Sequence, residues 1–533
     1  SLEQEKTRLF STALSLNPIH FSLMLALGFV FLSPSVQAED MAIRADKSAP
    51  GNQQPTVLQT GNGIPQVNIQ APSQAGVSRN QYSQFDVAEK GAVLNNARKA
   101  SQTQMAGWVQ GNPNLARGEA KVILNEVNSA NPSRLKGYVE VAGKKADVVI
   151  ANPSGIQCDG CGVINAGRTT LTTGKAEVEN GELKGYRVQG GKVSVGQKGM
   201  DTSKADYTDI IADKAEIKGG VWGNKVKVTT GKNKVDRTND SVVYVGDKNT
   251  NETDRTSESQ NGQTQTYSVD VGQLGGMYAE KIHLVDNGQG LGVRNAGHIG
   301  AAAGEVKIDS QGKIVNDGFI GGSENTQLNA KKNIENRGTV YAKAQAQLNA
   351  QNIDNKQGVI AGKQVQLSAN NVDNRKQSDK GSLIVASDKV SVKAKNVDNQ
   401  GTKANSKTEQ GIRGAQVAII ADNLSNQQGG IYTDEHANLN MTKTIDNKDG
   451  EIEASKSIEL TAKTLANDGS VKTKGDLTVH LQDGLVLNNA FQAGGSLDFK
   501  TQGNLTNNSQ LRVGNKLSVQ AANIENTKEA EIS

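Results

Sequence analysis

The stretch KADVVIANPSGIQCDGCGVINAGRTTLTTG, from Lys145 to Gly174, joins an apolar strand, a proline turn, a two-cysteine loop and a second apolar strand. Apolar residues alternate along Ala146 to Ile150, which is the period of a half-buried strand. That strand must end at Asn152-Pro153, because proline has no N–H to donate to a sheet. Asn, Pro and Gly suit the first, second and fourth positions of a type I turn. The stretch therefore predicts strands joined by tight corners.

A second turn of the same kind lies upstream. Asn112-Pro113-Asn114-Leu115 precedes a strand expected from Ala120 to Val127. A third pair, Asn131-Pro132, lies between the two and shows that Asn-Pro alone indicates only a turn. The signal therefore comes from the ordered set of motifs and not from either tetrapeptide.

The ordered set of NPNL, NPSGI, CDGCG and GRTTLTTG resembles the secretion domain of two-partner secretion exoproteins, the filamentous haemagglutinin family. The family's second motif usually reads NPNGI, so Ser154 departs from it, and any contact made there by an Asn side chain is in question. The resemblance implies a right-handed parallel β-helix whose N-terminal region caps the first coil. It also implies transporter recognition through, or a turn role for, Asn112, Pro113, Asn114, Leu115, Asn152, Pro153, Ser154, Gly155 and Ile156.

The composition favours a narrow core over wide globular ones. The 533 residues include 58 Gly and 9 Pro, and only 4% are aromatic, so stacked Val, Ile, Leu and Ala must fill the interior. The formal charge of +4 is spread over 59 basic and 55 acidic residues. Nucleic-acid binding needs clustered Lys and Arg, so it is not indicated.

Residues 1–38 have the pattern of an export signal. Lys6 and Arg8 precede an apolar run from Ile19 to Leu32, and Ala38 offers a cleavage position before Glu39. A transmembrane anchor is the alternative, but the run is too short to span a bilayer comfortably. The sequence starts at Ser1 and stops inside a repeat at Ser533, so we expect the signal and the C-terminal part to be incomplete.

Residues 39–300 are expected to form the secretion domain, as a series of short strands separated by Gly, Asn and Pro. A polar segment, 231–266, has few apolar residues apart from Val242 to Val245. Such a segment cannot bury enough surface to offset its ordering entropy. We therefore predict an exposed, mobile insertion there, with a binding loop that orders on contact as the alternative.

Residues 301–533 repeat a short unit with a period of about 20 residues. In the unit from Gly450 to Asn467, alternate residues are apolar, which is a strand period broken at Gly and Asn corners. One such unit cannot fold alone, so neighbouring units must cover it above and below. Corner asparagines would then stack along the axis as a hydrogen-bonded ladder. The repeated corners are Asn333–Asn336, Asn352–Asn355, Asn371–Asn374, Asn396–Asn399, Asn423–Asn426, Thr444–Asn447, Thr464–Asn467, Asn504–Asn507 and Asn523–Asn526.

Cys158 and Cys161 are the only two cysteines. In an exported chain we expect them to form a disulfide that closes a short loop. A reduced pair and a redox or metal role are the alternatives, although no second Cys pair and no nearby His completes a metal site. Closing a loop this short removes little entropy from the unfolded chain, so the disulfide adds little stability in that way. Local rigidity is its expected use.

No catalytic constellation stands out. The five histidines are scattered, and the Asp residues of the repeat, Asp354, Asp373, Asp398 and Asp446, are expected to be corner residues bonded to the backbone. We predict no enzymatic activity, cofactor or metal.

Three functions are weighed. The first, which the family resemblance implies, is a secreted surface exoprotein, recognised by the periplasmic domains of an outer-membrane transporter of the two-partner (TpsB, Omp85) type, whose repeats present an adhesive surface to a host-cell or bacterial receptor. The second, which the resemblance implies equally, is a contact-dependent growth inhibition exoprotein with a toxic tip beyond Ser533. The third, a β-helical carbohydrate-active enzyme, has no site to support it.

Overall fold

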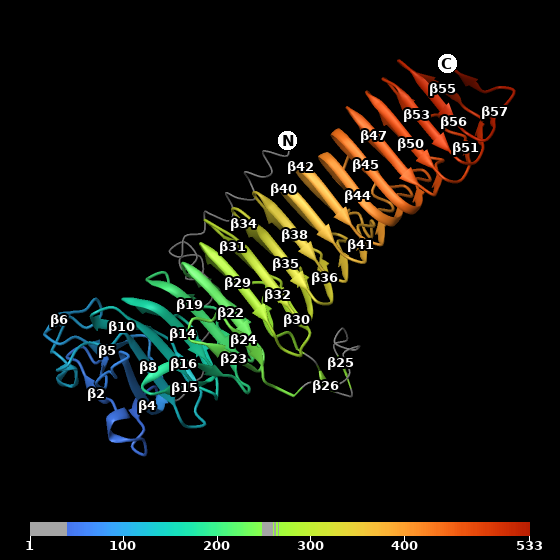
Figure 1. The fold of residues 1–533 in the computed structure, drawn as a ribbon. Helices are drawn as coiled ribbons and strands as arrows, with labels where there is room; N and C mark the ends of the chain where they lie inside the picture. Colours follow the sequence, from blue (N-terminus) through green and yellow to red (C-terminus); the bar gives the residue numbers. More distant parts are fainter. Residues whose placement is uncertain (1–39, 248–258, 261–262, 265) are drawn as a thin grey trace, which may run out of the picture.

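The computed structural model describes residues 40–247, 259–260, 263–264 and 266–533. These residues form a long parallel β-solenoid of about 19 turns, with the first coils at one end and residue 533 at the other (Figure 1). The predicted all-β solenoid is therefore confirmed. The expected cleavage position between Ala38 and Glu39 lies outside the described residues. Within the described residues, no helix is long and apolar enough to cross a membrane.

Each coil contributes a strand to up to three faces, and each strand pairs in parallel with the equivalent strand of the next coil. The first face consists of β5 (Ala92–Asn96), β10 (Tyr138–Gly143), β13 (Cys161–Ile164), β18 (Met200–Asp201), β21 (Gly220–Trp222), β28 (Gly276–Ala279), β31 (His298–Ala301), β34 (Phe319–Gly322), β37 (Thr339–Ala342), the first parts of β40 (Val359–Ser368), β42 (Leu383–Lys393), β44 (Gly411–Ser425) and β45 (Gly430–Asp446), then β46 (Glu451–Ala454), β49 (Ser470–Thr473), β52 (Gln492–Ala493), β55 (Gln510–Val513) and β58 (Glu531–Ile532).

The second face consists of β4 (Val77–Phe85), β8 (Val122–Val127), β11 (Ala146–Ala151), β14 (Ala166–Thr172), β19 (Ala205–Ala212), β22 (Lys225–Thr230), β29 (Lys281–Asp286), β32 (Val306–Ser310), β35 (Thr326–Ala330), β38 (Gln345–Asn349), the later parts of β40, β42, β44 and β45, then β47 (Ser457–Ala462), β50 (Asp476–Leu481), β53 (Leu497–Thr501) and β56 (Leu517–Gln520).

The third face consists of β9 (Ser133–Leu135), β12 (Ile156–Cys158), β17 (Lys192–Val195), β20 (Lys214–Ile217), β27 (Val269–Val271), β30 (Gly292–Asn295), β33 (Lys313–Asn316), β36 (Asn333–Asn336), β39 (Asn352–Asp354), β41 (Asn371–Asp373), β43 (Asn396–Asp398), the ends of β44 and β45, β48 (Thr464–Ala466), and a separate group of β51 (Leu485–Leu487), β54 (Leu505–Asn507) and β57 (Ile524–Asn526).

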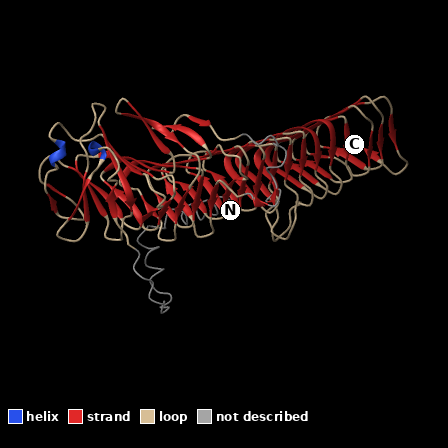
Figure 2. Ribbon diagram, turned by 90° about the horizontal axis from the view of Figure 1, so that it is seen from below, coloured by secondary structure: helices blue, strands red, loops and turns tan. Residues whose placement is uncertain are grey.

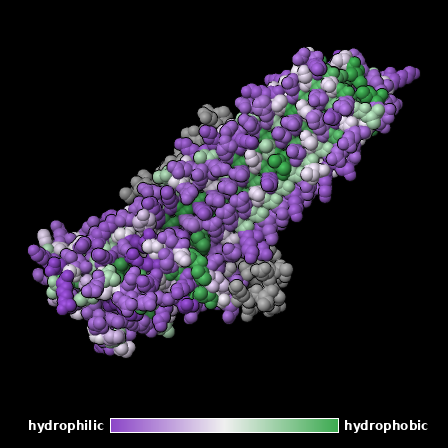
Figure 3. Space-filling view, viewed as in Figure 1, coloured by the Kyte–Doolittle hydropathy of each residue, from purple (hydrophilic) through white to green (hydrophobic). Residues whose placement is uncertain are grey.

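The core is one continuous column of aliphatic side chains. Inward residues occupy the same register position from coil to coil, so each packs on its equivalents above and below. One such row on the first face is Ile299, Ile320, Val340, Ile360, Ile384, Ile412, Ile431, Ile452 and Val471. The alternating apolar positions predicted for residues 450–467 are buried, as expected. A polar surface encloses this narrow core on most of the visible face (Figure 3).

A column of buried asparagines runs along the corner that follows the third face. Each side-chain amide donates to the Oδ1 atom of its equivalent in the next coil; Asn336 reaches Asn355 at 2.9 Å and Asn399 reaches Asn426 at 2.8 Å. Asn399 Nδ2 also donates to the Gly430 carbonyl at 2.9 Å. The predicted ladder is confirmed, and its members are Asn295, Asn316, Asn336, Asn355, Asn374, Asn399, Asn426, Asn447 and Asn467.

The buried column, which we call the asparagine ladder, is interrupted where a leucine takes its place, and an amide contact of the same kind resumes from Asn507 to Asn526 at 2.9 Å. Leu487 is buried and pairs in register with Asn507 on the third face. Asn467 Nδ2 is consequently buried without a hydrogen-bond partner. At the same coil the third-face pairing stops, since β51, β54 and β57 form a sheet of their own. The loss of one amide therefore coincides with a local break in the backbone pairing.

The first coil is closed by antiparallel strands. β1 (Ile43–Ala45) pairs antiparallel with β4, and β2 (Thr56–Gln59) pairs antiparallel with β3 (Pro65–Asn68), which lies beside β5. The two short helices, η1 (Gly51–Gln53) and η2 (Pro113–Leu115), lie at this same end (Figure 2). An antiparallel cover of this kind protects an edge that would otherwise pair with other chains.

A second layer covers the outside of the second face near this end. It is a four-stranded antiparallel sheet of β15 (Lys175–Glu179), β16 (Glu182–Arg187), β23 (Asn233–Asp236) and β24 (Val242–Tyr244) (Figure 1). Its Tyr186 and Val235 pack on outward residues of the solenoid such as Leu124 and Val149. The predicted half-buried strand at 146–150 is therefore buried on both sides.

An ion pair stands beside this layer. Arg168 Nη1 lies 2.6 Å from Asp209 Oδ2, and Asn239 Nδ2 donates to the other oxygen of that carboxylate at 3.3 Å. Burial raises the pKa of Asp209, and the Arg168 guanidinium opposes that shift. Because the carboxylate has these partners, it can stay buried under the turn that joins β23 to β24.

The prediction that 231–266 forms an exposed, mobile insertion is wrong for its first half. Asn233–Asp236 and Val242–Tyr244 are strands of the second layer, and Asn233, Val235 and Asn239 are buried. These strands bury apolar side chains against a sheet that earlier residues form. Whether they are ordered therefore does not depend on their own composition alone. Further along, β25 (Ser259–Gln260) pairs with β26 (Gln263–Thr264). Residues 248–258, 261–262 and 265 of the segment lie outside the described residues.

The asparagine ladder predicts that replacing a buried asparagine costs more stability than replacing an exposed asparagine in the same coil. Asn399→Ala should destabilise the surrounding coils by about 1–3 kcal/mol, because Asn374 Nδ2 would lose the nearer of its two buried acceptors and the Gly430 carbonyl would lose its side-chain donor. The matched control is Asn396→Ala, which interrupts an exposed asparagine column in the same coil and should cost less than about 0.5 kcal/mol. Amide hydrogen exchange over residues 371–447 measures both, and equal loss of protection in the two variants would contradict the expectation.

Candidate functional site

The first Asn-Pro turn is the corner that leads into the second face. Pro113–Leu115 form η2, and Asn112 caps it by accepting the Asn114 N–H at Oδ1, 2.9 Å away. Asn112 Nδ2 points inward and donates to the carbonyls of Ile69, at 2.9 Å, and Asn95, at 3.0 Å. Leu115 is fully buried in the core. The turn thus anchors the chain at the N-terminal end through both its amide and its leucine.

The second Asn-Pro turn is the corner that leaves the second face, between β11 and β12. The Gly155 N–H donates to the Asn152 carbonyl at 3.0 Å, and the Ser154 N–H donates to Asn152 Oδ1 at 3.0 Å. Gly155 has a φ of 115°, a left-handed value that favours glycine. Asn152 Nδ2 donates to the Asn131 carbonyl at 2.8 Å. The expected turn geometry is present, and the side chain of Asn152 is fully buried.

The third residue of the turn is Asn114 in the first motif and Ser154 in the second, and both side chains donate to a backbone carbonyl. Asn114 Nδ2 donates to the Ile69 carbonyl at 3.1 Å. Ser154 Oγ donates to the Ser129 carbonyl at 3.2 Å. Both residues therefore tie their turn to a backbone carbonyl of another segment, so the serine that departs from the family pattern still makes a structural contact.

Asn131, from the third Asn-Pro pair, lies directly beside the second turn, since β9 pairs with β12 in register. The first and second turns lie at opposite corners of the second face. No hydrogen bond or ion pair between described residues joins the two turns. The structure therefore does not bring the two motifs into one binding site.

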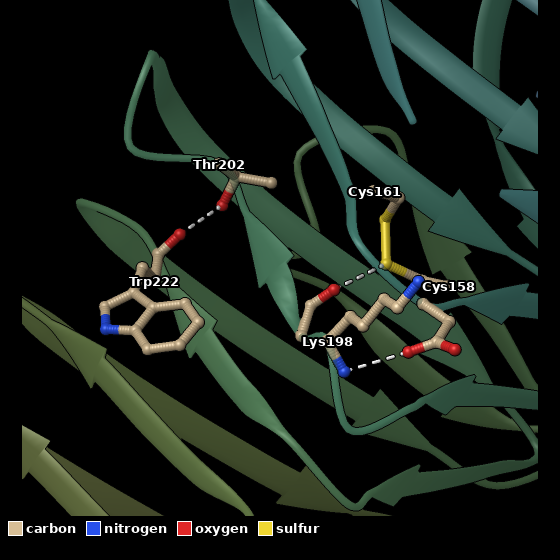
Figure 4. The surroundings of a disulfide bond; sticks show 7 residues. Cys158, Cys161, Lys198, Thr202 and Trp222 are labelled. Atoms are coloured by element: carbon tan, nitrogen blue, oxygen red, sulfur yellow. Dashed lines mark hydrogen bonds between the residues drawn. A yellow bond between two sulfur atoms is a disulfide. The ribbon is translucent and has the colours of Figure 1, made fainter. Parts of the chain in front are cut away.

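The two-cysteine loop is a further corner, between the third face and the first. Cys158 ends β12, Cys161 begins β13, and a disulfide joins them. Both side chains are buried in the core. Asp159 Oδ1, in the loop, accepts the Lys198 N–H of the following coil at 2.9 Å (Figure 4). The loop is thus held rigidly between coils.

The acidic and histidine residues of the repeats do not assemble a reactive site. Asp354, Asp373 and Asp398 each accept the N–H two residues further on, at 2.9 to 3.1 Å, as the corner interpretation predicts. His436 Nδ1 lies 2.7 Å from Ser457 Oγ, but the acid in that row, Asp476, lies on the serine's other side. A triad needs the acid on the histidine. In the part of the chain that the structure describes, no three His, Cys, Asp or Glu side chains gather as a metal site.

One groove adjoins the first turn and a second adjoins the first groove; reasoning from sequence did not anticipate either. One, of about 580 Å³, is lined by residues including Arg98, Lys99, Asn112, Pro113 and Lys144. The other, of about 720 Å³, is lined by residues including Trp108, Glu140, Lys145 and Lys204. They share Ser101 and Gly143. The signal that could have identified them is a lone tryptophan in a glycine-flanked polar stretch beside the NPNL motif.

Comparison with family models divides the chain in two. Residues 41–316 match the TPS secretion domain. Residues 323–376, 360–428, 414–509 and 488–533 match the haemagglutinin repeat. The boundary between the two models falls within the continuous solenoid.

Curated relatives are similar over half of this chain or somewhat more. Toxin CdiA of Yersinia pestis is 51% identical over 329 residues, which are 62% of this chain and 10% of that protein. The tRNA nuclease CdiA-2 of Burkholderia pseudomallei is 41% identical over 278 residues, which are 52% of this chain and 8% of that protein. The aligned region thus spans a tenth or less of the length of these relatives.

Among solved structures, the secretion domain of filamentous hemagglutinin is 28% identical, with a TM-score of 0.45. The match covers 61% of this chain and 96% of that one.

The second turn predicts a measurable dependence on its buried amide. Asn152→Ala should destabilise the turn by about 1–3 kcal/mol, because Ser154 N–H and the Asn131 carbonyl would both lose a buried partner. Hydrogen exchange at the Ser154 and Gly155 amides measures the effect. The control, Asn131→Ala, leaves the accepting carbonyl in place and alters an exposed side chain, so it should change exchange little. Equal acceleration in both variants would refute the structural role of Asn152.

Proposed function

The chain belongs to the family defined by the TPS secretion domain, and on that premise we propose that residues 41–316 are the part that an outer-membrane transporter recognises. Proteins of this family are exported across the outer membrane to the cell surface by two-partner secretion. The observation that carries the proposal is the family match over more than half of the chain. The transporter is the TpsB partner of the system.

The proposed contact is with the periplasmic domains of that transporter. Three corners of the first coils, at Asn112, Asn152 and the Cys158–Cys161 disulfide, are fixed by hydrogen bonds or a covalent bond. A fixed surface binds a partner with less loss of conformational entropy than a mobile one. This rigidity supports a recognition role for the N-terminal end of the solenoid.

The repeats after residue 316 fit a chain that crosses the pore extended and folds outside. Ladder contacts join residues only 19 to 27 positions apart, so each emerging coil finds its partner in the coil just folded. Burial and backbone pairing would then be gained one coil at a time. We propose that this stepwise gain biases the chain outward and that the finished rod presents a receptor-binding surface.

A second candidate is contact-dependent growth inhibition. It is favoured by the relatives named toxin CdiA and tRNA nuclease CdiA-2, which are 51% and 41% identical to this chain. The chain aligns with a tenth or less of those proteins, so the toxic or nuclease activity in their names is not assigned to these residues. In this version the rod would carry an effector toward a neighbouring bacterium, and in the first it would act as an adhesin.

The export proposal is tested by producing the full chain with and without its cognate transporter. With the transporter, the chain should become sensitive to protease added outside the cell. Without it, the chain should remain in the periplasm. Equal surface exposure in both strains would refute the proposal. Cells that display the chain should also be mixed with host cells and with related bacteria, where attachment to bacteria alone favours growth inhibition and attachment to host cells favours adhesion.

Stepwise folding predicts that one disrupted coil slows export. Ile360→Asp places a charge in the core at a fully buried position of β40, so the coil should fail to stack and surface exposure of later residues should fall several-fold. Lys363→Asp, at an exposed position of the same strand, is the matched control and should be exported like the unchanged chain. Protease sensitivity measured against time after induction separates the two. Identical export kinetics would exclude folding as the source of bias.

A further inference from the structure

Trp108 is the most exposed large hydrophobic side chain among the described residues. Its exposed fraction is 71%, and it lies on a small hairpin of β6 (Ser101–Gln102) and β7 (Trp108–Val109) at the N-terminal end of the solenoid (Figure 1). Trp is enriched at the centres of protein interfaces, where it contributes much of the binding energy. A tryptophan held in water therefore requires an explanation.

The hairpin is rigid, so the exposure of Trp108 does not arise from a loose loop. Val109 and Ala106 are buried in a small apolar cluster on the outside of the first face. The Glu140 carboxylate accepts the N–H groups of Gln104, at 2.7 Å, and Met105, at 2.9 Å. The hairpin tip is thus bonded to β10, so the backbone that carries Trp108 is fixed on the first face.

The NPNL turn holds this hairpin in place. Gln110, next to β7, has its carbonyl bonded by Asn95 Nδ2 at 2.9 Å. Asn112 follows two residues later and donates to the carbonyl of the same Asn95 at 3.0 Å. The Asn112 side chain is only 3% exposed, so a partner cannot reach it. The NPNL motif can therefore affect a partner only indirectly, by positioning the hairpin of β6 and β7.

The surroundings of the hairpin are basic. Arg98, Lys99 and Lys144 line one adjoining groove, and Lys204 lines the other with Trp108. None of these four cations forms an ion pair with a carboxylate among the described residues. Two carboxylates line the grooves; Glu140 is occupied by the hairpin tip, and Glu119 stands beside the first turn. Lys145 is paired with Asp206 at 2.8 Å. The charge around Trp108 is thus predominantly uncompensated and positive.

We propose that Trp108 and its basic rim, defined as Arg98, Lys99, Lys144 and Lys204, are the surface through which the secretion domain docks on the periplasmic domain of its transporter. The complementary partner surface has an apolar pocket for the indole, bordered by carboxylates. Asn112 is a positioning residue for this surface and makes no contact of its own. This inference rests on the proposed export function and names the contact within it.

Tryptophan fluorescence provides a direct test, because the chain has only two tryptophans. Trp222→Phe leaves Trp108 as the sole reporter in the full chain. Its emission should be that of a solvated indole, and adding the purified periplasmic domain of the transporter should shift the emission to the blue and lower quenching by iodide. Binding without any change in emission or quenching would overturn the proposal.

Substitution provides the second test. Trp108→Ala should weaken binding of the full chain to the periplasmic domain about 30-fold. The control is Leu274→Ala, which removes a side chain that is 68% exposed in the same domain and should change binding less than twofold. Lys99→Glu combined with Lys144→Glu should weaken binding and flatten its dependence on salt. Circular dichroism and protease resistance check that each variant is folded.

The outcomes separate this inference from the export proposal. If the unchanged chain binds the periplasmic domain and Trp108→Ala binds equally well, the docking surface is wrong and the export proposal stands. If the unchanged chain reaches the surface without its transporter, both are wrong. The positioning role of Asn112 is supported if Asn112→Ala weakens binding and if, on adding the periplasmic domain, Trp108 in that variant shows a smaller blue shift and less protection from iodide than in the unchanged chain.

Discussion

The structure depends on parallel backbone pairing between coils that follow each other in sequence. No coil has a core of its own, because each contributes only one layer of aliphatic side chains to the column. Its N–H and C=O groups are likewise satisfied by the coils on either side. The asparagine ladder adds side-chain amides to the same scheme and keeps the corners in register. At the coil where Leu487 replaces an amide, Asn467 Nδ2 has no partner and the third-face pairing is interrupted, so the two systems fail at the same place.

A solenoid built in this way has to protect its outer surfaces and its first edge. At the N-terminal end, antiparallel strands cover the first coil, and the second layer covers apolar residues that point outward from the second face. This gives the first coils two layers, whereas the described coils from β27 onward have no such second layer. The change therefore comes before residue 316, where the match to the secretion domain ends.

Much of this could be predicted from sequence because it is local and periodic. The alternation of apolar residues, the corner asparagines and the Asn-Pro turns each depend on a few neighbouring residues, and the structure confirms all three. The order of residues 233–244 could not be predicted, because it depends on Leu124 and Val149, which lie far away in sequence. Val235 on β23 and Val242 on β24, which pair with each other, were the available signal. One apolar residue on each strand suffices where earlier residues already form a sheet that covers them. The exposure of Trp108 was also beyond a reading of composition, because it follows from which side of a hairpin Val109 buries.

The burial of Asn112 and Asn152 decides how the Asn-Pro motifs can act. Their amides are bonded to backbone carbonyls of neighbouring segments and are almost inaccessible to solvent. In a fully extended chain, a transporter could contact these amides, but the corner geometry that they create would be absent. A transporter that meets folded coils contacts the hairpin, the grooves and the basic rim, which require β5 and β10 to have paired. The proposed docking therefore requires the first coils to fold before contact, and the proposed stepwise folding requires the repeats to stay unfolded until they have crossed. The cap and the second layer give those first coils contacts that do not depend on the later repeats, and such an order of events needs contacts of that kind.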